Sequence, residues 1–307
     1  MIGMVVACVL WGSSHAVVKT AMEGTPPMLL AALRLAIASP LLILMQLGLR
    51  RPAVLPSDRL PLFRLSLIGI VASYFLFYTG MQMTLSSDAS LMIVGEVIFT
   101  AIFAFLLLRE RITRNRLIGL VVGTIGAVVL ITGAAGHNTD TASNRVLGDL
   151  MILGCLACES YYTVKGSAYL ERNDPISLLA WVNTASLIVW IPVIGYYAAN
   201  GALQTVTTET WLATVYMAAV TSAICYYLWF TGVRMVGATV AAVALLFQPV
   251  VGASVGISVM GDPVTLTFVI GGVCIIGALA ISSIPEKDHT PSPIDSALLP
   301  NESEHTQ

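Results

Sequence analysis

An internal repeat limits the architectures open to this chain more than any other feature. Residues 77–83 read FYTGMQM and residues 229–235 read WFTGVRM, so the two segments are separated by 229 − 77 = 152 positions. The same offset pairs Glu96 with Gln248, Glu110 with Asp262, Thr113 with Thr265 and Gly119 with Gly271. The chain is therefore expected to be a duplicated unit whose two copies fold alike.

The composition is that of a membrane protein. Hydrophobic residues make up 57% of the 307 residues, charged residues only 10%, and the mean hydropathy is +0.85. A soluble domain would carry roughly 25% charged residues, whereas a helix needs about 20 mostly apolar residues to cross a bilayer. Apolar runs of this length predict ten spans, at residues 2–21, 27–47, 62–83, 88–108, 116–133, 147–169, 176–199, 211–234, 238–260 and 264–284.

Each copy holds an odd number of spans, and this has a topological consequence. The second copy must enter from the opposite side, so the chain is predicted to be an all-α membrane protein with ten transmembrane helices in two inverted five-helix repeats. The repeats cover residues 1–133 and 146–284, and residues 285–307 are predicted to form a disordered cytoplasmic tail. Such repeats favour a secondary transporter with a midplane site, although a duplication can also persist in a channel or an enzyme.

The placement of positive charge predicts the orientation. With a cytoplasmic N-terminus, eleven basic residues fall on the cytoplasmic side and only Arg145 falls in an outer loop. The eleven are Arg50, Arg51, Arg59, Arg64, Arg109, Arg111, Arg114, Arg116, Arg172, Arg234 and Lys287. The positive-inside rule then predicts a multi-pass protein of a bacterial-type inner membrane with both termini in the cytoplasm.

Four polar side chains are expected to reach similar depths from four different spans. At about 1.5 Å per residue, His15 lies about 19 Å into its span, Glu96 about 13 Å, Glu159 about 17 Å and Gln248 about 15 Å. The hydrocarbon layer is about 30 Å thick, so all four lie near its centre. Because buried ionisable groups normally face a polar interior, they predict one shared aqueous pocket.

Neighbouring residues suggest what this pocket recognises. Trp11 and His15 share a helix face, and His15 could donate to a bound carboxylate or change protonation near neutral pH. It could also be a buried histidine bonded to a backbone carbonyl. Glu96 shares a face with Phe99, which suits an apolar or amphipathic substrate bearing an ammonium group. A hydrogen bond between packed helices is the alternative for Glu96.

One arginine and an aromatic pair complete the candidates. Arg34 lies about 10 Å inside its span, where it could snorkel to the surface, pair with an internal carboxylate or hold an anionic group. Tyr74 and Tyr78 lie one turn apart, and Tyr226 with Phe230 repeats this pair in the second half. These rings are expected either to pack between helices or to form walls of the pocket. The predicted substrate-binding residues are Trp11, His15, Tyr74, Tyr78, Glu96, Phe99, Glu159, Tyr162, Trp229 and Gln248.

Two further groups of residues carry structural expectations. Lys19 and Lys165 lie near span ends, where snorkelling to the interface is expected. Helix breakers near span centres permit bending or expose backbone groups to a cavity. The residues expected to interrupt helices in this way are Gly12, Gly95, Pro40, Pro192 and Pro249.

The sequence argues against enzymatic chemistry. It contains no Walker-type phosphate loop and no His-Glu-x-x-His motif, and a single histidine within the spans cannot supply a metal site. Cys155 and Cys158 have the spacing of a redox or metal pair but lack a second pair, so they are interpreted as packing residues. No cofactor, metal ion or nucleic acid is expected as a partner. The expected partners are a small-molecule substrate and the lipid bilayer.

Several short motifs resemble a known family. They are Trp11-Gly12, Arg34, the run from Glu96 to Arg109-Glu110, Gln248-Pro249, and the run ending at Gly261-Asp262 before Gly271-Gly272. This pattern resembles the drug/metabolite transporter superfamily, specifically its EamA-type ten-helix exporters. Within it the chain is similar to the YddG-type exporters, which implies efflux of aromatic and other bulky neutral amino acids. The family usually places proline after the polar residue of the fourth helix, whereas this chain has Val97, so a hinge in the first half is in doubt.

The expected function is therefore secondary export of amino acids or related metabolites by alternating access. A nucleotide-sugar or sugar-phosphate carrier of the same fold is one alternative, but it should need several cavity cations, and only Arg34 is deep. A passive small-solute channel is another alternative.

Overall fold

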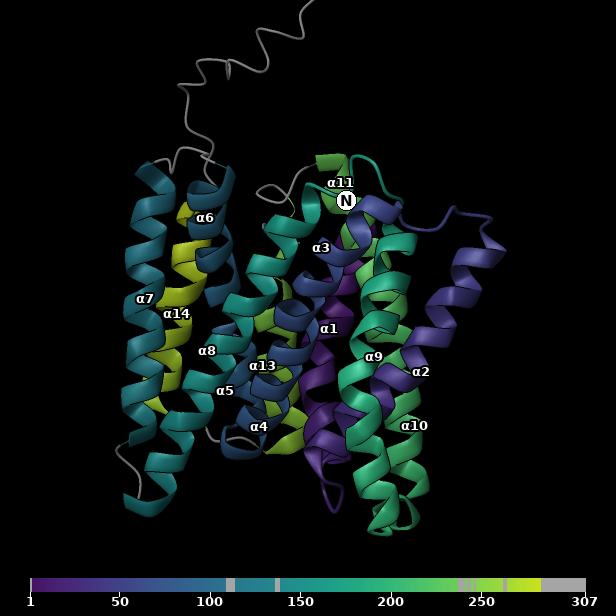
Figure 1. Ribbon diagram of the computed structural model, residues 1–307. Coiled ribbons are helices and arrows are strands. Elements are labelled where there is room, and N and C mark those ends of the chain that lie inside the picture. Colours follow the sequence, from purple (N-terminus) through teal and green to yellow (C-terminus); the bar gives the residue numbers. More distant parts are fainter. Residues whose placement is uncertain are drawn as a thin grey trace, which may run out of the picture.

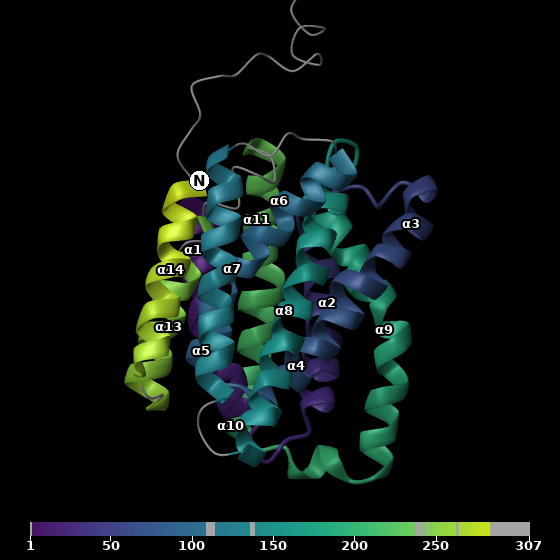
Figure 2. The same cartoon turned by 90° about the vertical axis from the view of Figure 1, so that its left-hand side faces the viewer.

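A computed structural model describes residues 2–108, 114–135, 139–236, 241, 244–245, 247–261 and 264–282. All regular structure in this part of the chain is helical. The predicted disordered tail, as well as Arg109, Glu110 and Asp262 of the family motifs, lies outside the described residues. The helices cross the molecule back and forth, as Figure 1 and Figure 2 show.

The two halves of the chain contribute corresponding series of helices. The first half holds α1 (Ile2–Ala21), α2 (Pro27–Gly48), α3 (Pro56–Ser66), the π-helix η1 (Leu67–Ala72), α4 (Ser73–Met83), α5 (Ser86–Met92), α6 (Val94–Leu108) and α7 (Arg114–Ala135). The second half holds α8 (Thr139–Ser167), α9 (Pro175–Ala199), the 3-10 helix η2 (Ala202–Thr205), α10 (Thr208–Tyr216), the π-helix η3 (Met217–Cys225), α11 (Tyr226–Val236), α13 (Phe247–Met260) and α14 (Leu266–Ser282).

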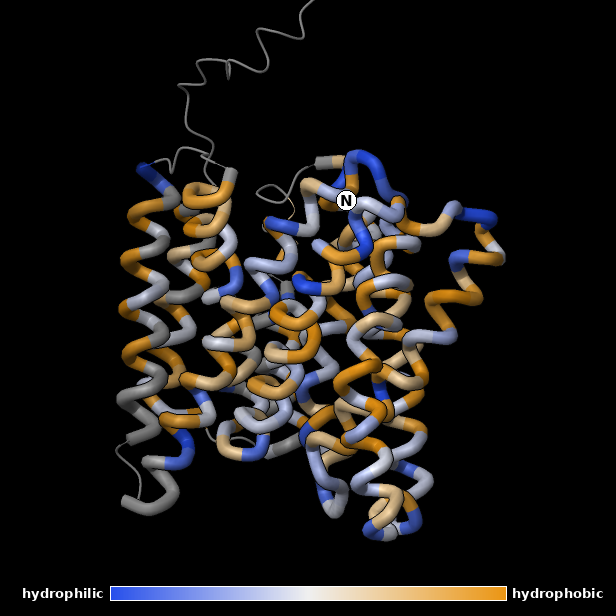
Figure 3. Tube along the Cα trace, in the orientation of Figure 1, coloured by the Kyte–Doolittle hydropathy of each residue, from blue (hydrophilic) through white to orange (hydrophobic). Residues whose placement is uncertain are grey.

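Length and composition single out the membrane-crossing helices. Within the described ranges, five are long and apolar enough to span a bilayer, namely Ile2–Ala21, Pro27–Gly48, Pro56–Met83, Pro175–Ala199 and Thr208–Met235. Apolar residues dominate the middle of the molecule and hydrophilic ones gather toward its two ends, as Figure 3 shows. This confirms an all-helical membrane protein, and the count of ten spans stays a prediction.

Local sequence explains where several helices begin. Proline opens α2, α3 and α9, where its fixed φ fits the first turn and its missing N–H loses no bond. Asp174 caps α9, because its side chain accepts a hydrogen bond from the Ile176 amide at 3.2 Å. The prediction that Gly12, Pro40 and Pro192 interrupt helices was wrong, since α1, α2 and α9 run through them. The break expected at Gly95 does occur nearby, between α5 and α6 at Ile93.

The two π-helical segments occupy matching places in the repeat. The offset of 152 carries residues 67–72 of η1 to 67 + 152 = 219 through 72 + 152 = 224, which lie inside η3. Each segment is followed by the tyrosine that begins the aromatic pair, Tyr74 after η1 and Tyr226 after η3. Such wide turns are rare and recur at functional sites.

Glycines set the closest helix crossings. A Cβ placed on Gly80 of α4 would lie 2.8 Å from the carbonyl oxygen of Gly148 in α8. A Cβ on Gly12 of α1 would lie 2.7 Å from the carbonyl oxygen of Gln248 in α13. Small residues allow this backbone approach, which is how helices pack in a membrane. The chain's two halves therefore meet along α4–α8 and α1–α13, while α2 packs on α9 and α7 on α14.

A polar cluster ties α3 to the segment before α9. The buried carboxylate of Asp58 accepts bonds from Arg172 Nε at 2.9 Å and Asn173 Nδ2 at 2.7 Å.

Asp58→Ala is expected to lower the free energy of unfolding by about 1–3 kcal/mol, because Asn173 loses a charged acceptor while half-exposed Arg172 regains water. Thermal unfolding in detergent measures this. Arg51→Ala, which removes an exposed ion pair with Asp174, should cost about 1 kcal/mol or less; equal effects would contradict the expectation.

Candidate functional site

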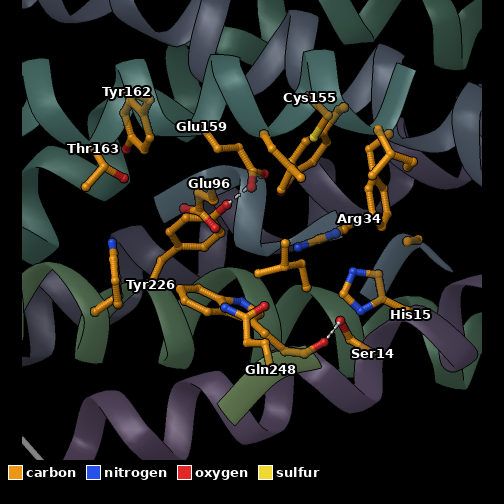
Figure 4. Close-up of a pocket in the computed structure, with 18 residues that line it drawn as sticks. Ser14, His15, Arg34, Glu96, Cys155, Glu159, Tyr162, Thr163, Tyr226 and Gln248 are labelled. Atoms are coloured by element: carbon orange, nitrogen blue, oxygen red, sulfur yellow. Dashed lines mark hydrogen bonds between the residues drawn. The ribbon is translucent and has the colours of Figure 1, made fainter. Parts of the chain in front are cut away.

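One internal cavity of about 80 Å³ lies between the two halves, lined by residues of α1, α2, α4, α5, α6, α8, α11 and α13. A single water needs about 10–15 Å³ on this measure, so the space holds several waters. Figure 4 shows the polar side chains that converge on it. Eight of the predicted residues line it: Trp11, His15, Tyr74, Glu96, Glu159, Tyr162, Trp229 and Gln248.

Two carboxylates form the acidic part of the wall. Glu96 stands in the first turn of α6, directly after the break at Ile93, where the helix dipole favours negative charge. Ser160 of α8 donates to the Glu96 backbone carbonyl at 2.8 Å and so fixes α6 against α8. Glu159, the residue before Ser160, accepts a bond from the Tyr226 hydroxyl at 3.4 Å. Both acids enter the cavity from adjacent helices, as Figure 4 shows.

Arg34 supplies the cationic part of the wall. Its Nε donates to Ser222 Oγ of η3 at 2.8 Å, and its Nη1 lies 3.5 Å from the Tyr78 hydroxyl. The guanidinium carbon sits 4.8 Å from the centre of the Tyr74 ring, within the range of a cation–π contact. Snorkelling to the surface is therefore excluded for Arg34, which is buried and lines the cavity.

His15 and Trp11 are both anchored to backbone carbonyls. His15 Nδ1 lies 3.4 Å from the Gly12 carbonyl oxygen, and the ring also lines the cavity. Donation from His15 to a bound carboxylate stays a prediction. Trp11 Nε1 donates to the carbonyl oxygen of Thr221 at 3.0 Å. Since Thr221 lies within η3, this bond ties α1 to a π-helical turn of the other half.

Aromatic rings close the sides of the cavity. The Trp11 ring lies 4.9 Å from Tyr226 and 5.9 Å from Trp229, both edge to face. The ring of Tyr162 packs against η1 of the opposite half, because a Cβ on Gly69 would lie 2.5 Å from its Cβ and Cγ atoms. The Tyr162 hydroxyl is buried and makes no hydrogen bond with a described residue. These rings give flat apolar walls for a bulky side chain.

Two predicted residues lie outside the lining. Tyr78 is completely buried, with its hydroxyl beside Arg34 and 3.8 Å from the Met217 sulfur. Phe99 packs with Gly95 and the neighbouring apolar cluster around Met92. Several lining residues were absent from the predicted set: Ser14, Arg34, Phe77, Ala89, Ile93, Ile152, Cys155, Leu156, Thr163 and Tyr226. The repeat offset that relates Tyr74 to Tyr226 could have identified Tyr226.

Polar contacts gather where α1 and α4 end, and one of them joins the two halves. Lys19 Nζ donates to the carbonyl oxygens of Met81 and Thr84 at 2.5 and 2.6 Å, so the expected snorkelling of Lys19 was wrong. The Thr84 hydroxyl also donates to the buried carboxylate of Asp149 in α8. A buried apolar cluster lies between these polar contacts and the cavity, formed by Met81, Ala89, Met92, Ile93, Ile152 and Leu156. The bond from Thr84 to Asp149 and this apolar cluster both include residues of each half.

The cavity wall combines charged, polar and aromatic groups. In the described part of the chain, no three His, Cys, Asp or Glu side chains gather as a metal ion would need. Cys155, interpreted from the sequence as a packing residue, is buried and also lines the cavity. The wall offers two carboxylates, one guanidinium, an imidazole, an amide and several aromatic rings, which suits a small molecule with both polar ends and an apolar body.

Comparison with known proteins finds relatives that are named as transporters. The chain is 23% identical to "Uncharacterized transporter YetK" of Bacillus subtilis (strain 168), over 93% of this chain and 87% of the relative. It is 28% identical to "Probable amino-acid metabolite efflux pump" of Salmonella typhimurium (strain LT2), over 89% of this chain and 91% of the relative. It is 27% identical to "S-adenosylmethionine/S-adenosylhomocysteine transporter" of Chlamydia trachomatis serovar L2, over 85% of this chain and 83% of the relative.

A solved crystal structure shares the fold. It aligns with a TM-score of 0.65 at 21% sequence identity, covering 92% of this chain and 97% of that one. The model of the EamA-like transporter family matches residues 1–132 and again residues 146–284. The chain has apolar helices and a polar cavity between two halves, and the family model matches most of its length. It therefore belongs to the EamA-like transporter family and is a membrane transporter.

Proposed function

We propose that this transporter exports amino acids with aromatic or other bulky neutral side chains by alternating access through the midplane cavity. The observation that carries the proposal is the cavity itself, to which both halves donate polar side chains: His15, Arg34 and Glu96 from the first, Glu159 and Gln248 from the second. The aromatic walls suit a bulky side chain, and the carboxylates suit an ammonium group. The name of the Salmonella relative, an amino-acid metabolite efflux pump, supports the same class of substrate.

The proposed architecture is two inverted five-helix repeats, bounded near residues 1–133 and 146–284, in a bacterial-type inner membrane. The separate family matches to residues 1–132 and 146–284 support it. The helix contacts also support it. In the repeat, α1 corresponds to α8, α4 to α11 and α6 to α13, and the contacts α4–α8 and α6–α8 have the counterparts α1–α11 and α1–α13. The start of α1 and the end of α14 lie at the same face, uppermost in Figure 1, as an even number of crossings requires. The charge asymmetry makes that face cytoplasmic.

Flux into liposomes tests the proposal. Purified protein in proteoliposomes loaded with unlabelled L-phenylalanine should take up radiolabelled L-phenylalanine in saturable exchange, without ATP. Unlabelled leucine and tryptophan should compete, whereas protein-free liposomes give the background. If none of the twenty amino acids is exchanged at millimolar concentration, the proposed substrate class is wrong. Single-channel currents in a planar bilayer, far faster than carrier turnover, would instead identify a passive channel.

A further inference from the structure

Arg34 is a buried cation that forms no salt bridge with a described carboxylate. It is only 8% exposed, and guanidinium groups keep their charge in proteins. The described part of the chain places no carboxylate within 4.0 Å of it, since its ion pairs join Arg51, Arg145, Arg172 and Arg234 to aspartates outside the cavity. Charges at membrane depth are normally paired or face water and substrate. The cavity therefore offers a place for an anionic group beside Arg34.

The guanidinium is held in a fixed orientation. Ser222 accepts from Nε at 2.8 Å, Tyr78 lies 3.5 Å from Nη1, and the Tyr74 ring covers one face. Tyr74 is itself held, because its hydroxyl lies 3.3 Å from Ser222 Oγ. Two of the five N–H groups are thus engaged by the protein. The other three make no hydrogen bond with a described residue, and Figure 4 shows the Arg34 head group within the cavity.

The shape of the free donors matches a particular ligand. A guanidinium presents parallel N–H groups that bind both oxygens of a carboxylate at once. His15 is a poorer candidate for this task, because its Nδ1 is directed to the Gly12 carbonyl oxygen. The acidic residues, Glu96 of α6 and Glu159 of α8, line the same cavity and come from other helices than Arg34. Their carboxylates would repel a substrate carboxylate and attract its ammonium group.

We propose that Arg34 is the carboxylate subsite of the cavity, held in position by Ser222 and Tyr74. It would select substrates with a free α-carboxylate and orient them with the ammonium group toward Glu96 and Glu159. This inference rests on the proposed function and sharpens it, because it assigns recognition of the carboxylate to one side chain. It predicts that the transporter rejects amines and amides whose side chains would otherwise fit.

Exchange measurements with two matched ligands test this assignment. L-phenylalanine and L-phenylalaninamide share the ring and the ammonium group and differ in the carboxylate. In wild-type proteoliposomes, the amide should compete roughly tenfold to a hundredfold more weakly, the equivalent of a hydrogen bond to a charged group. Arg34→Gln should raise the KM for phenylalanine by a similar factor and reduce the preference over the amide to about twofold or less.

Ser222→Ala separates positioning from packing. It keeps Arg34 but removes the Nε acceptor, so we expect KM for phenylalanine to rise a few-fold with kcat nearly unchanged and KM for the amide unmoved. This variant, together with the wild-type preference, decides the question if Arg34→Gln does not fold. Equal competition by both ligands in the wild type, or an equal loss of both in Arg34→Gln, would show that Arg34 is structural. Absence of all amino acid exchange by the wild type would instead overturn the proposed function.

Discussion

Replacing Gly80 by leucine is expected to destabilise the protein by about 3 kcal/mol or more and to lower its melting temperature strongly. The reason is the crossing of α4 and α8, where even a Cβ on Gly80 would lie 2.8 Å from the Gly148 carbonyl oxygen and 3.1 Å from the Met151 Cβ. Backbone atoms cannot move aside as a flexible side chain can, so the helices would have to separate. Overpacking a close contact typically costs about 1–3 kcal/mol and sometimes more, out of a total stability of about 5–15 kcal/mol.

The measurement is the melting temperature in detergent together with the monodisperse fraction on size exclusion. Gly195→Leu is the matched control, because Gly195 lies within α9 and a Cβ there meets nothing within 4 Å. It makes the same chemical change in a transmembrane helix and should leave stability within about 0.5 kcal/mol. If Gly80→Leu melts together with Gly195→Leu, the two halves do not pack as closely as the structure shows.

The second large effect is expected in the double variant Glu96→Gln with Glu159→Gln, which should lose amino acid exchange entirely. Each carboxylate can accept a charged hydrogen bond from a substrate ammonium group, a contact of about 1.5–3 kcal/mol. Each single variant should therefore lower kcat/KM roughly tenfold or more, since one acid remains. Radiolabelled exchange over a range of phenylalanine concentrations measures kcat/KM for the single variants and any exchange left in the double variant. The same assays at several pH values test whether transport is coupled to protons. If the pH dependence of exchange disappears in Glu96→Gln, Glu96 is the residue that carries the proton.

A suitable control is Glu171→Gln, which changes an exposed carboxylate between α8 and α9. It should transport like the wild type. Thermal unfolding of every variant is needed to show that the cavity substitutions leave the fold intact. Substantial exchange by the folded double variant would mean that the ammonium group is recognised elsewhere, and the acids would then have only a structural role.

Most of the helix bounds could be predicted from the sequence because lipid imposes a simple rule. Backbone groups in hydrocarbon must be paired within the helix, so apolar runs between charged turns become helices; the runs predicted at 2–21 and 27–47 differ from α1 and α2 by at most one residue. The same rule explains the wrong expectations about breakers. Although Pro40 cannot donate its own bond, α2 continues past it. Near Gly95 a break does appear, at Ile93.

The site was harder to predict, for reasons that the geometry makes clear. Depth along a helix follows from counting residues. This count predicted that Glu96, Glu159 and Gln248 lie near one another, and all three line the cavity. The direction of a side chain depends on neighbours that come from the other half. Arg34 had three open roles until Ser222 of η3 was seen to hold it. Lys19 likewise finds carbonyl partners at the end of α4, which no local pattern indicates.

The matching wide turns of η1 and η3 have a consequence for the history of the chain. If the wide turns arose after the duplication, a residue would have had to be inserted independently at the same turn of two separate helices. If the insertion came before the duplication, a single event explains both turns. The simplest order of events is thus that the ancestor already carried this distortion when its gene was doubled. A single-repeat descendant, assembling as an antiparallel pair, should then show the same turn in its third helix.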